Sequence, residues 1–183
     1  GLDVAGVIES VGSNVTSWRS GDQVMALVRG AYAEYSAARS VLTYRPPAGM
    51  SVTDAASLPC VFLTAWYAFK MAGLKRGETA LIHAAGSGVG MAGIQIARAL
   101  GARVLTSAGS DERVARGREL GAEDGVNYSS QNVTEELLRL TDGQGVNVVL
   151  DTVGGEIFDA TLKALAEGGR VVTVGAVGGQ RSQ

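Results

Sequence analysis

The sequence has little cysteine and no excess of either charge. Its single cysteine excludes a disulfide within the chain, which suits a reducing cytoplasm. The net charge is −2 and the basic residues form no block, so nucleic acid is not an expected partner. No apolar run reaches the length of a membrane span and the N-terminus carries no signal-peptide pattern, so no membrane partner is expected.

What is present fits an ordinary globular protein. Hydrophobic residues make up 46% and charged residues 19% of 183 positions, which allows one good core or one and a half small domains. Both ends look cut. Gly1 begins within a strand-like run without an initiator methionine, and a glycine-rich tail follows the last predicted strand at 170–174. We therefore expect a fragment whose C-terminal end is incomplete.

The clearest motif is a run of small residues between a strand and a helix. Residues 79–83 are apolar and predict a buried strand, and residues 88–100 predict a helix that Gly101 ends. From Ala84 to Gly90 nothing is bulkier than Val89, so the backbone can turn tightly and approach a ligand. Gly88-Val-Gly90-Met-Ala-Gly93 fits GxGxxG, and Gly86 offers a second register, in a chain with 26 glycines. A strand, a glycine turn and a helix together point free N–H groups at a phosphate.

The pattern around this motif supports a nucleotide-binding α/β domain rather than a chance glycine turn. Strands and helices alternate from Glu78 onward, which predicts a parallel sheet covered on both sides. The predicted strands are 79–83, 103–107, 125–128, 147–151 and 170–174. The predicted helices are 88–100, 111–120, 132–141 and 156–166.

The N-terminal part has a different pattern from the alternating strands and helices that follow Glu78. Short strand-like runs at 4–11, 21–27 and 31–36 are separated by glycine turns, which predicts an antiparallel β region. Pro46-Pro47 breaks the pattern, and we place a domain boundary between residues 48 and 49. A helix is predicted over 60–72, with its aromatic residues packed in the core: Phe62, Trp66, Tyr67 and Phe69.

Taken together, these segments resemble the medium-chain dehydrogenase/reductase superfamily and its quinone oxidoreductase branch, which includes the enoyl reductase domains of synthases. The resemblance rests on residues 1–12, Gly21-Asp-Gln-Val, Thr64-Ala-Trp-Tyr, Ala84-Ala-Gly-Ser-Gly-Val-Gly90, Leu120-Gly-Ala-Glu, Val126-Asn-Tyr128 and Leu150-Asp-Thr-Val-Gly-Gly155. It implies an α/β protein: a Rossmann doubly wound parallel sheet over 49–183, preceded by part of a GroES-like β-rich catalytic domain over 1–48.

The resemblance also implies that the protein binds no zinc. Leu2 stands where zinc-dependent relatives place a histidine ligand, and Cys60 stands at another ligand position. One thiolate cannot make a catalytic zinc site, which needs about three protein ligands. We read Cys60 as an ordinary buried thiol.

NADPH is the expected cofactor. The strand over 103–107 is followed by Ala108, where NAD-specific domains place a carboxylate. Ser107 and Ser110 could donate to a 2′-phosphate and Arg113 could supply charge, although Arg113 also fits a solvated surface residue. The positions that match the family's cofactor site are Thr64, Ser87, Gly88, Val89, Gly90, Ser107, Ser110, Arg113, Tyr128, Thr152, Val153 and Gly175. For Thr64, Thr152, Val153 and Gly175 plain packing or loop chemistry is the alternative. His83, beside the turn, is read as a packed, hydrogen-bonded side chain.

The resemblance predicts hydride transfer to a quinone or α,β-unsaturated carbonyl in a full-length homodimer. Two alternatives stay open: an enoyl-thioester reductase domain of a polyketide or fatty-acid synthase, and an NADPH-binding protein without turnover. No catalytic acid is assigned. Tyr32 and Tyr67 are candidates by side chain only, and core packing is the preferred interpretation for both.

Overall fold

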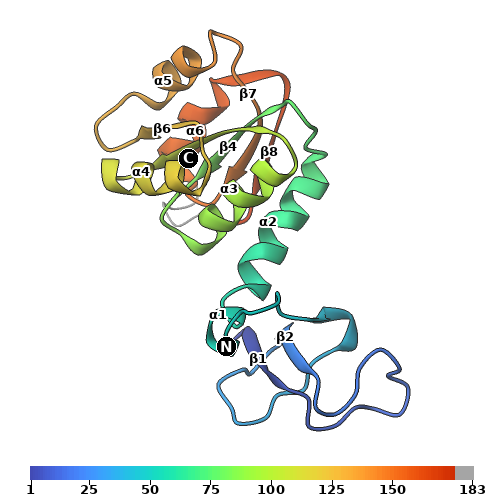
Figure 1. The fold of residues 1–183 in the computed structure, drawn as a ribbon. Helices are drawn as coiled ribbons and strands as arrows, with labels where there is room; N and C mark the ends of the chain where they lie inside the picture. Colours follow the sequence, from blue (N-terminus) through green and yellow to red (C-terminus); the bar gives the residue numbers. More distant parts are fainter. Residues whose placement is uncertain (176–183) are drawn as a thin grey trace. The chain divides into compact units, whose positions relative to one another are not determined.

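The computed structural model describes residues 1–175, and its internal contacts divide the chain into two units between Leu63 and Thr64 (Figure 1). This division lies later in the chain than the boundary predicted between residues 48 and 49. Helix α2 (Pro59–Ala72) runs across it, as the helix predicted over 60–72. Each unit has its own sheet.

The first unit is a small antiparallel sheet, as the short strands predict. β1 (Asp3–Val7) pairs with β2 (Gln23–Leu27), which pairs with β3 (Thr43–Tyr44). The 3-10 helix η1 (Ser40–Leu42) precedes β3, and α1 (Val52–Ala55) follows. The strand expected over 31–36 is not formed. Its alternating pattern has no buried face, because Tyr32 is 95% exposed and Tyr35 is 75% exposed.

The second unit is a five-stranded parallel sheet in the order β6-β5-β4-β7-β8, with helices between successive strands. This is the predicted Rossmann arrangement. The chain adds strands outward from β4 in one direction and then in the other, so the order reverses between β4 and β7. Ligands bind at such a reversal, outside the carboxyl ends of the strands. The strands are β4 (Thr79–His83), β5 (Arg103–Ala108), β6 (Asp124–Asn127), β7 (Val146–Asp151) and β8 (Leu165–Thr173).

Side-chain caps fix where the helices begin. The side chains of Ser87, Ser110 and Asn132 each accept a hydrogen bond from the backbone N–H three residues on, which starts the helices that follow them. Gly121, in the left-handed conformation at φ 117°, ends the second of these. The helices are α3 (Gly88–Ala99), α4 (Asp111–Leu120), α5 (Val133–Leu140) and α6 (Gly155–Leu162).

The core of the second unit is built from apolar residues of the predicted strands and helices. Leu81, Leu105 and Val149 of the sheet are fully buried and pack with Leu137 of α5. The helix predicted over 156–166 is too long, because α6 ends at Leu162 and β8 begins at Leu165. A register irregularity between Val146 and Val148 on the neighbouring strand lets β8 start before the glycines at 168 and 169 and continue after them.

Aromatic packing was only partly predicted. Phe69 of α2 is 2% exposed and belongs to the core, as expected. Trp66 and Tyr67 are 51% and 62% exposed, so the core-packing interpretation is wrong for both, as it is for Tyr32. The side chains of Tyr32 and Tyr67 form no hydrogen bond within residues 1–175 that would mark them as functional groups.

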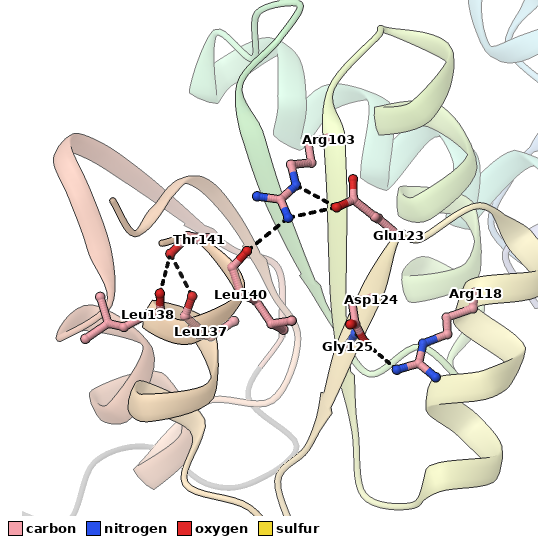
Figure 2. Close-up of polar contacts among 9 residues, drawn as sticks. All are labelled: Arg103, Arg118, Glu123, Asp124, Gly125, Leu137, Leu138, Leu140 and Thr141. Atoms are coloured by element: carbon pink, nitrogen blue, oxygen red, sulfur yellow. Dashed lines mark hydrogen bonds and ion pairs between the residues drawn. The ribbon is translucent and has the colours of Figure 1, made fainter. Parts of the chain in front are cut away.

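Ion pairs hold the amino-terminal edge of the second sheet, opposite the carboxyl ends (Figure 2). Arg103 of β5 donates through Nε and Nη2 to Glu123 Oε1, at 3.0 and 2.7 Å, and through Nη2 to the Leu140 carbonyl at 2.9 Å. Arg118 of α4 pairs with Asp124 at the start of β6. These contacts join α4, α5, β5 and β6 at the end of the sheet opposite the carboxyl ends, where ligands bind in such folds.

A second arginine ties the edge strand β8 to the segment before β4. Arg170 makes a bidentate pair with Glu78, at 2.9 and 2.8 Å, and donates to the Ala72 and Gly73 carbonyls at 2.9 and 3.2 Å. The hydrogen bond from Arg170 is the largest contribution that lowers the pKa of Glu78, and burial opposes it.

We expect Arg170→Ala to lower the free energy of unfolding by about 1 to 3 kcal/mol, because Glu78 and two carbonyls then lose a charged donor. Urea unfolding measures the change. Arg116→Ala is the matched control: its pair with Glu119 leaves the two side chains 59% and 64% exposed, so an effect below about 0.5 kcal/mol is expected. Equal effects of the two substitutions would contradict this prediction.

One apolar stretch, Val52–Ala72, is long enough and apolar enough to cross a membrane by length and composition, which corrects the expectation that no run reaches that length. It comprises α1, α2 and the turn that separates them. A single such stretch is weak evidence for a membrane span, since core helices of globular proteins meet the same criterion.

Candidate functional site

The glycine turn (residues 84–90) lies between β4 and α3 at the reversal of the sheet order. Ala84 adopts a left-handed conformation at φ 55°, and Ser87 Oγ accepts from the Gly90 N–H at 3.0 Å. A Cβ at Gly90 would lie 2.1 Å from the Ala84 carbonyl oxygen, so only glycine fits there. Within residues 1–175 the N–H groups of Gly88 and Val89 form no hydrogen bond. The turn therefore presents free donors at a helix N-terminus, which favours an anion.

Arg113 brings a positive charge to the same turn. A Cβ on Gly86 would meet the Cδ of Arg113 at 3.1 Å and its Nε at 3.5 Å, so the arginine stem lies directly against this glycine. The exposed Arg113 side chain forms no hydrogen bond or ion pair with any residue in the described range 1–175. Ala108, at the end of β5, is buried and places no carboxylate beside it. Arg113 thus lies beside the turn, and its contact with a 2′-phosphate stays a prediction.

The two predicted serines differ. Ser110 Oγ caps α4 by accepting from the Arg113 N–H at 3.4 Å, which leaves its hydroxyl hydrogen available to a ligand. Ser107 is fully buried and its hydroxyl lies 2.5 Å from His83 Nδ1. The structure thus gives Ser107 an internal hydrogen-bond partner and buries its side chain. Its contact with the cofactor stays a prediction that this burial does not favour.

Tyr128 directly follows β6 at the carboxyl ends of the strands and packs next to Gly109. A Cβ on Gly109 would lie 3.2 Å from Cε2 of the Tyr128 ring, and Ser129 Oγ donates to the Gly109 carbonyl at 3.0 Å. The Asn127 side chain donates to Asp111 Oδ1 at 2.9 Å and accepts from the Ser129 N–H at 3.1 Å. These bonds fix the aromatic ring next to the loop that carries Ser110.

The loop after β7 (residues 152–154) adds a hydroxyl without a partner. Asp151 is fully buried, and its Oδ1 accepts from the N–H groups of Val153 and Gly154 at 2.9 and 3.0 Å. Thr152 Oγ1 is buried and has no hydrogen-bond partner among the described residues. Gly175 lies beside it, since its Cβ would be 3.6 Å from the Thr152 carbonyl oxygen. A buried unpaired hydroxyl at the carboxyl edge of the sheet fits a ligand that supplies the missing bond.

Thr64 is a predicted site residue, but no hydrogen bond among residues 1–175 connects its side chain to the other predicted site residues. It is half-buried on α2, and its side chain makes no hydrogen bond within the described part of the chain. Its role in cofactor binding stays a prediction.

His83 is packed and hydrogen-bonded, as expected. It is fully buried at the end of β4 and contacts Ser107 and Thr161 of α6. Burial lowers the pKa of His83 to about 4, and the negative charge of Asp151 opposes that shift. The bond to Thr161 was not foreseen, because nothing in the sequence pattern joins residues 78 positions apart.

Two hollows elsewhere contain none of the predicted site residues. One, of about 600 Å³, lies in the first unit around β1, Val15 and Trp18. The other, of about 410 Å³, lies at the amino-terminal edge of the second sheet near Arg103 and Asn147. The predicted residues that stand out lie instead beyond the carboxyl ends of the strands: the free N–H groups after β4 with Arg113 beside them, and the Thr152 hydroxyl after β7.

The sheet order, the glycine turn and the charged helix end define a Rossmann nucleotide-binding domain. A family model described as zinc-binding dehydrogenase matches residues 88–183. The chain belongs to this family, within the medium-chain dehydrogenase/reductase superfamily.

Similar proteins include synthases and free-standing enzymes. Erythronolide synthase EryA2 of Saccharopolyspora erythraea is 40% identical over 178 residues, 96% of this chain and 5% of that protein. Quinone oxidoreductase of Homo sapiens is 34% identical over 181 residues, 97% of this chain and 55% of that protein. The solved structure of mycobacterial Rv1454c complexed with NADPH matches with a TM-score of 0.89 at 36% identity, covering 100% of this chain and 58% of that chain. The chain thus spans about half the length of the quinone oxidoreductase.

The zinc in the family description finds no fitting site among the described residues. Across residues 1–175, no group of three or more His, Cys, Asp or Glu side chains comes together. Leu2 carries no donor atom, and half-buried Cys60 is held through its backbone N–H, which donates to Asp3 Oδ1 at 2.6 Å. That the protein binds no zinc stays a prediction.

Proposed function

We propose that the second unit binds NADPH and that the protein is a zinc-free oxidoreductase that transfers hydride to a quinone or α,β-unsaturated carbonyl. The observation that carries the proposal is the unpaired Arg113 side chain against Gly86, beside the free N-terminus of α3. A dinucleotide with an additional phosphate matches both features, and Ala108 leaves no carboxylate to repel it.

Each residue of the site has a distinct task in this proposal. The N–H groups of Ser87, Gly88, Val89 and Gly90 surround the pyrophosphate position, although those of Ser87 and Gly90 already have partners. Arg113 and Ser110 hold the 2′-phosphate, and the Tyr128 ring packs against the adenine side. Thr152, with Val153 and Gly175, contacts the nicotinamide half, where the free hydroxyl can donate. When bound, NADPH supplies the hydride.

The chain's own part in the reaction is binding and orientation. A quinone or enone that accepts hydride becomes an anion that needs a proton or a hydrogen bond. We assign no catalytic residue to this step, because neither Tyr32 nor Tyr67 has a side-chain hydrogen bond among residues 1–175 that would mark it as the donor. The resemblance further predicts a cytoplasmic homodimer with a small-molecule substrate.

A second candidate is the enoyl-thioester reductase domain of a synthase, favoured by the 40% identity with EryA2. The Asp151-Thr-Val-Gly-Gly155 segment resembles free-standing oxidoreductases and favours the first candidate. A third is an NADPH-binding protein without turnover. NADPH consumption by the full-length protein with a quinone, an enone and an enoyl thioester separates the three: preference for the thioester supports the second, and consumption with none supports the third.

Cofactor choice provides the direct test of the binding site. We expect this chain to bind NADPH more tightly than NADH, and Arg113→Ala to weaken NADPH binding by roughly 10- to 100-fold while NADH binding is unchanged. Isothermal titration calorimetry measures both. Arg116→Ala is the control, because this arginine lies on the same helix and already pairs with Glu119. Equal affinities for the two cofactors would show that Arg113 and Ser110 are bystanders.

A further inference from the structure

His83 joins three elements that meet under the glycine turn. It lies opposite Ser107 in the register of β4 and β5, and its Nδ1 is 2.5 Å from the Ser107 hydroxyl oxygen. Its Nε2 is 3.1 Å from Thr161 Oγ1 on α6. His83 and Ser107 are fully buried and Thr161 is 1% exposed, so no water competes for these bonds.

The hydrogens of this chain of groups can be assigned by counting donors. Thr161 has one hydroxyl hydrogen and gives it to the Ile157 carbonyl, at 2.7 Å. Its oxygen must then accept from His83, which places the imidazole hydrogen on Nε2. A neutral imidazole has no hydrogen on Nδ1, so Ser107 must donate to that nitrogen. The bonds run in one direction, from Ser107 through His83 and Thr161 to Ile157, and every group is satisfied.

This chain of bonds holds the base of the proposed nucleotide site. The His83 backbone carries the strained Ala84, and a Cβ at Gly90 would lie 3.0 Å from the His83 carbonyl oxygen, so the first turn of α3 rests on this residue. The Ala85 N–H donates to the Ser107 carbonyl at 3.0 Å. On the other side, α6 begins directly after the loop that carries Thr152.

We propose that His83 is a positioning residue for the dinucleotide: its two hydrogen bonds fix the glycine turn relative to the Thr152 loop, so that the two halves of the cofactor meet groups at the correct separation. This inference rests on the proposed function. It concerns the neutral Nε2–H form of the imidazole, and the charged group that faces it is the carboxylate of Asp151.

Thr161→Val tests the inference, because valine keeps the shape of threonine and leaves the His83 Nε2–H without an acceptor. We expect NADPH binding, measured by calorimetry at 25 °C, to weaken by roughly tenfold. Thr161→Ser keeps the hydroxyl and is expected to restore the affinity. In ¹⁵N spectra of the chain's single histidine, the Nε2–H signal is expected in the unaltered chain and shifted in the valine variant.

Thr134→Val is the matched control. Thr134 also donates to the backbone of α6, at 2.8 Å from the Ala160 carbonyl oxygen, and does not contact His83. A loss of stability in both variants with weaker binding only in Thr161→Val supports positioning. Equal NADPH affinities of the unaltered chain and Thr161→Val, or equal losses in both variants, would overturn it. Failure of the unaltered chain to bind NADPH would overturn the proposed function, and this inference with it.

Discussion

Replacing Gly90 with alanine is expected to lower the free energy of unfolding by about 3 kcal/mol and to abolish dinucleotide binding. The new Cβ would lie 2.1 Å from the Ala84 carbonyl oxygen and 2.8 Å from the Ala84 carbonyl carbon. Both are backbone atoms of an already strained residue, so no side-chain rotation relieves the overlap. α3 must move away from β4, which displaces the free N–H groups. Urea unfolding and NADPH titration measure the two effects.

The neighbouring Gly86 provides the matched control for that substitution. A Cβ there meets only the flexible stem of Arg113, at 3.1 Å, and its backbone has no positive φ. We expect Gly86→Ala to change the free energy of unfolding by less than about 1 kcal/mol. Binding of NADPH, but not of NADH, is expected to weaken because Arg113 is pushed aside. A Gly90→Ala protein as stable as Gly86→Ala would contradict this prediction, because the turn would then accommodate a Cβ at residue 90.

The second large effect is a loss of stability in acid that depends on His83. The pKa of His83 is about 4 in the folded chain, against 6.5 for a free imidazole, so between these pH values the unfolded chain binds one proton more. The contribution of His83 to the free energy of unfolding is therefore fully present above about pH 6.5. It is lost as the pH falls from 6.5 to about 4. The full difference is on the order of 3 kcal/mol. Urea unfolding from pH 4 to pH 7 measures it.

His83→Asn removes the titrating group and leaves the carboxylates in place. Its stability is expected to depend less steeply on pH between 4 and 6.5, while any contribution of Glu78 and Asp124, whose pKa values are lowered, is common to both proteins. Proton NMR on the single histidine gives the pKa directly. Titration of the folded chain near pH 6.5 would contradict the prediction, because the imidazole would then be hydrated.

The parts of the fold that follow from local chemistry could be predicted. The strand before residue 84 and the end of the following helix at Gly101, which has φ 81°, each depend on residues within a few positions, so the sequence pattern contains them. The stem of Arg113 is also placed by local geometry, three residues into α4 after its cap. These features produced the Rossmann arrangement and most of the proposed cofactor site.

Side-chain burial and strand register were harder to predict, because they depend on contacts between residues that are distant in the sequence. Ser107 follows the same pattern as Ser110, yet its side chain is buried and hydrogen-bonded to His83 of the neighbouring strand. Tyr32 and Tyr67 have side chains that suit a core, but they are 95% and 62% exposed among the described residues. The start of β8 depends on its register against β7, which the glycines at 168 and 169 conceal.

The bond between His83 and Thr161 also has a consequence for synthesis. The central strand β4 leaves the ribosome 78 residues before its partner on α6, and β7 is made between them. At roughly 5 to 20 residues per second, the imidazole waits about 4 to 16 seconds for its second hydrogen bond. Until β7 (Val146–Asp151) has been made, one side of β4 has no neighbouring strand, and the glycine turn gains its support from α6 only after Thr161 has followed.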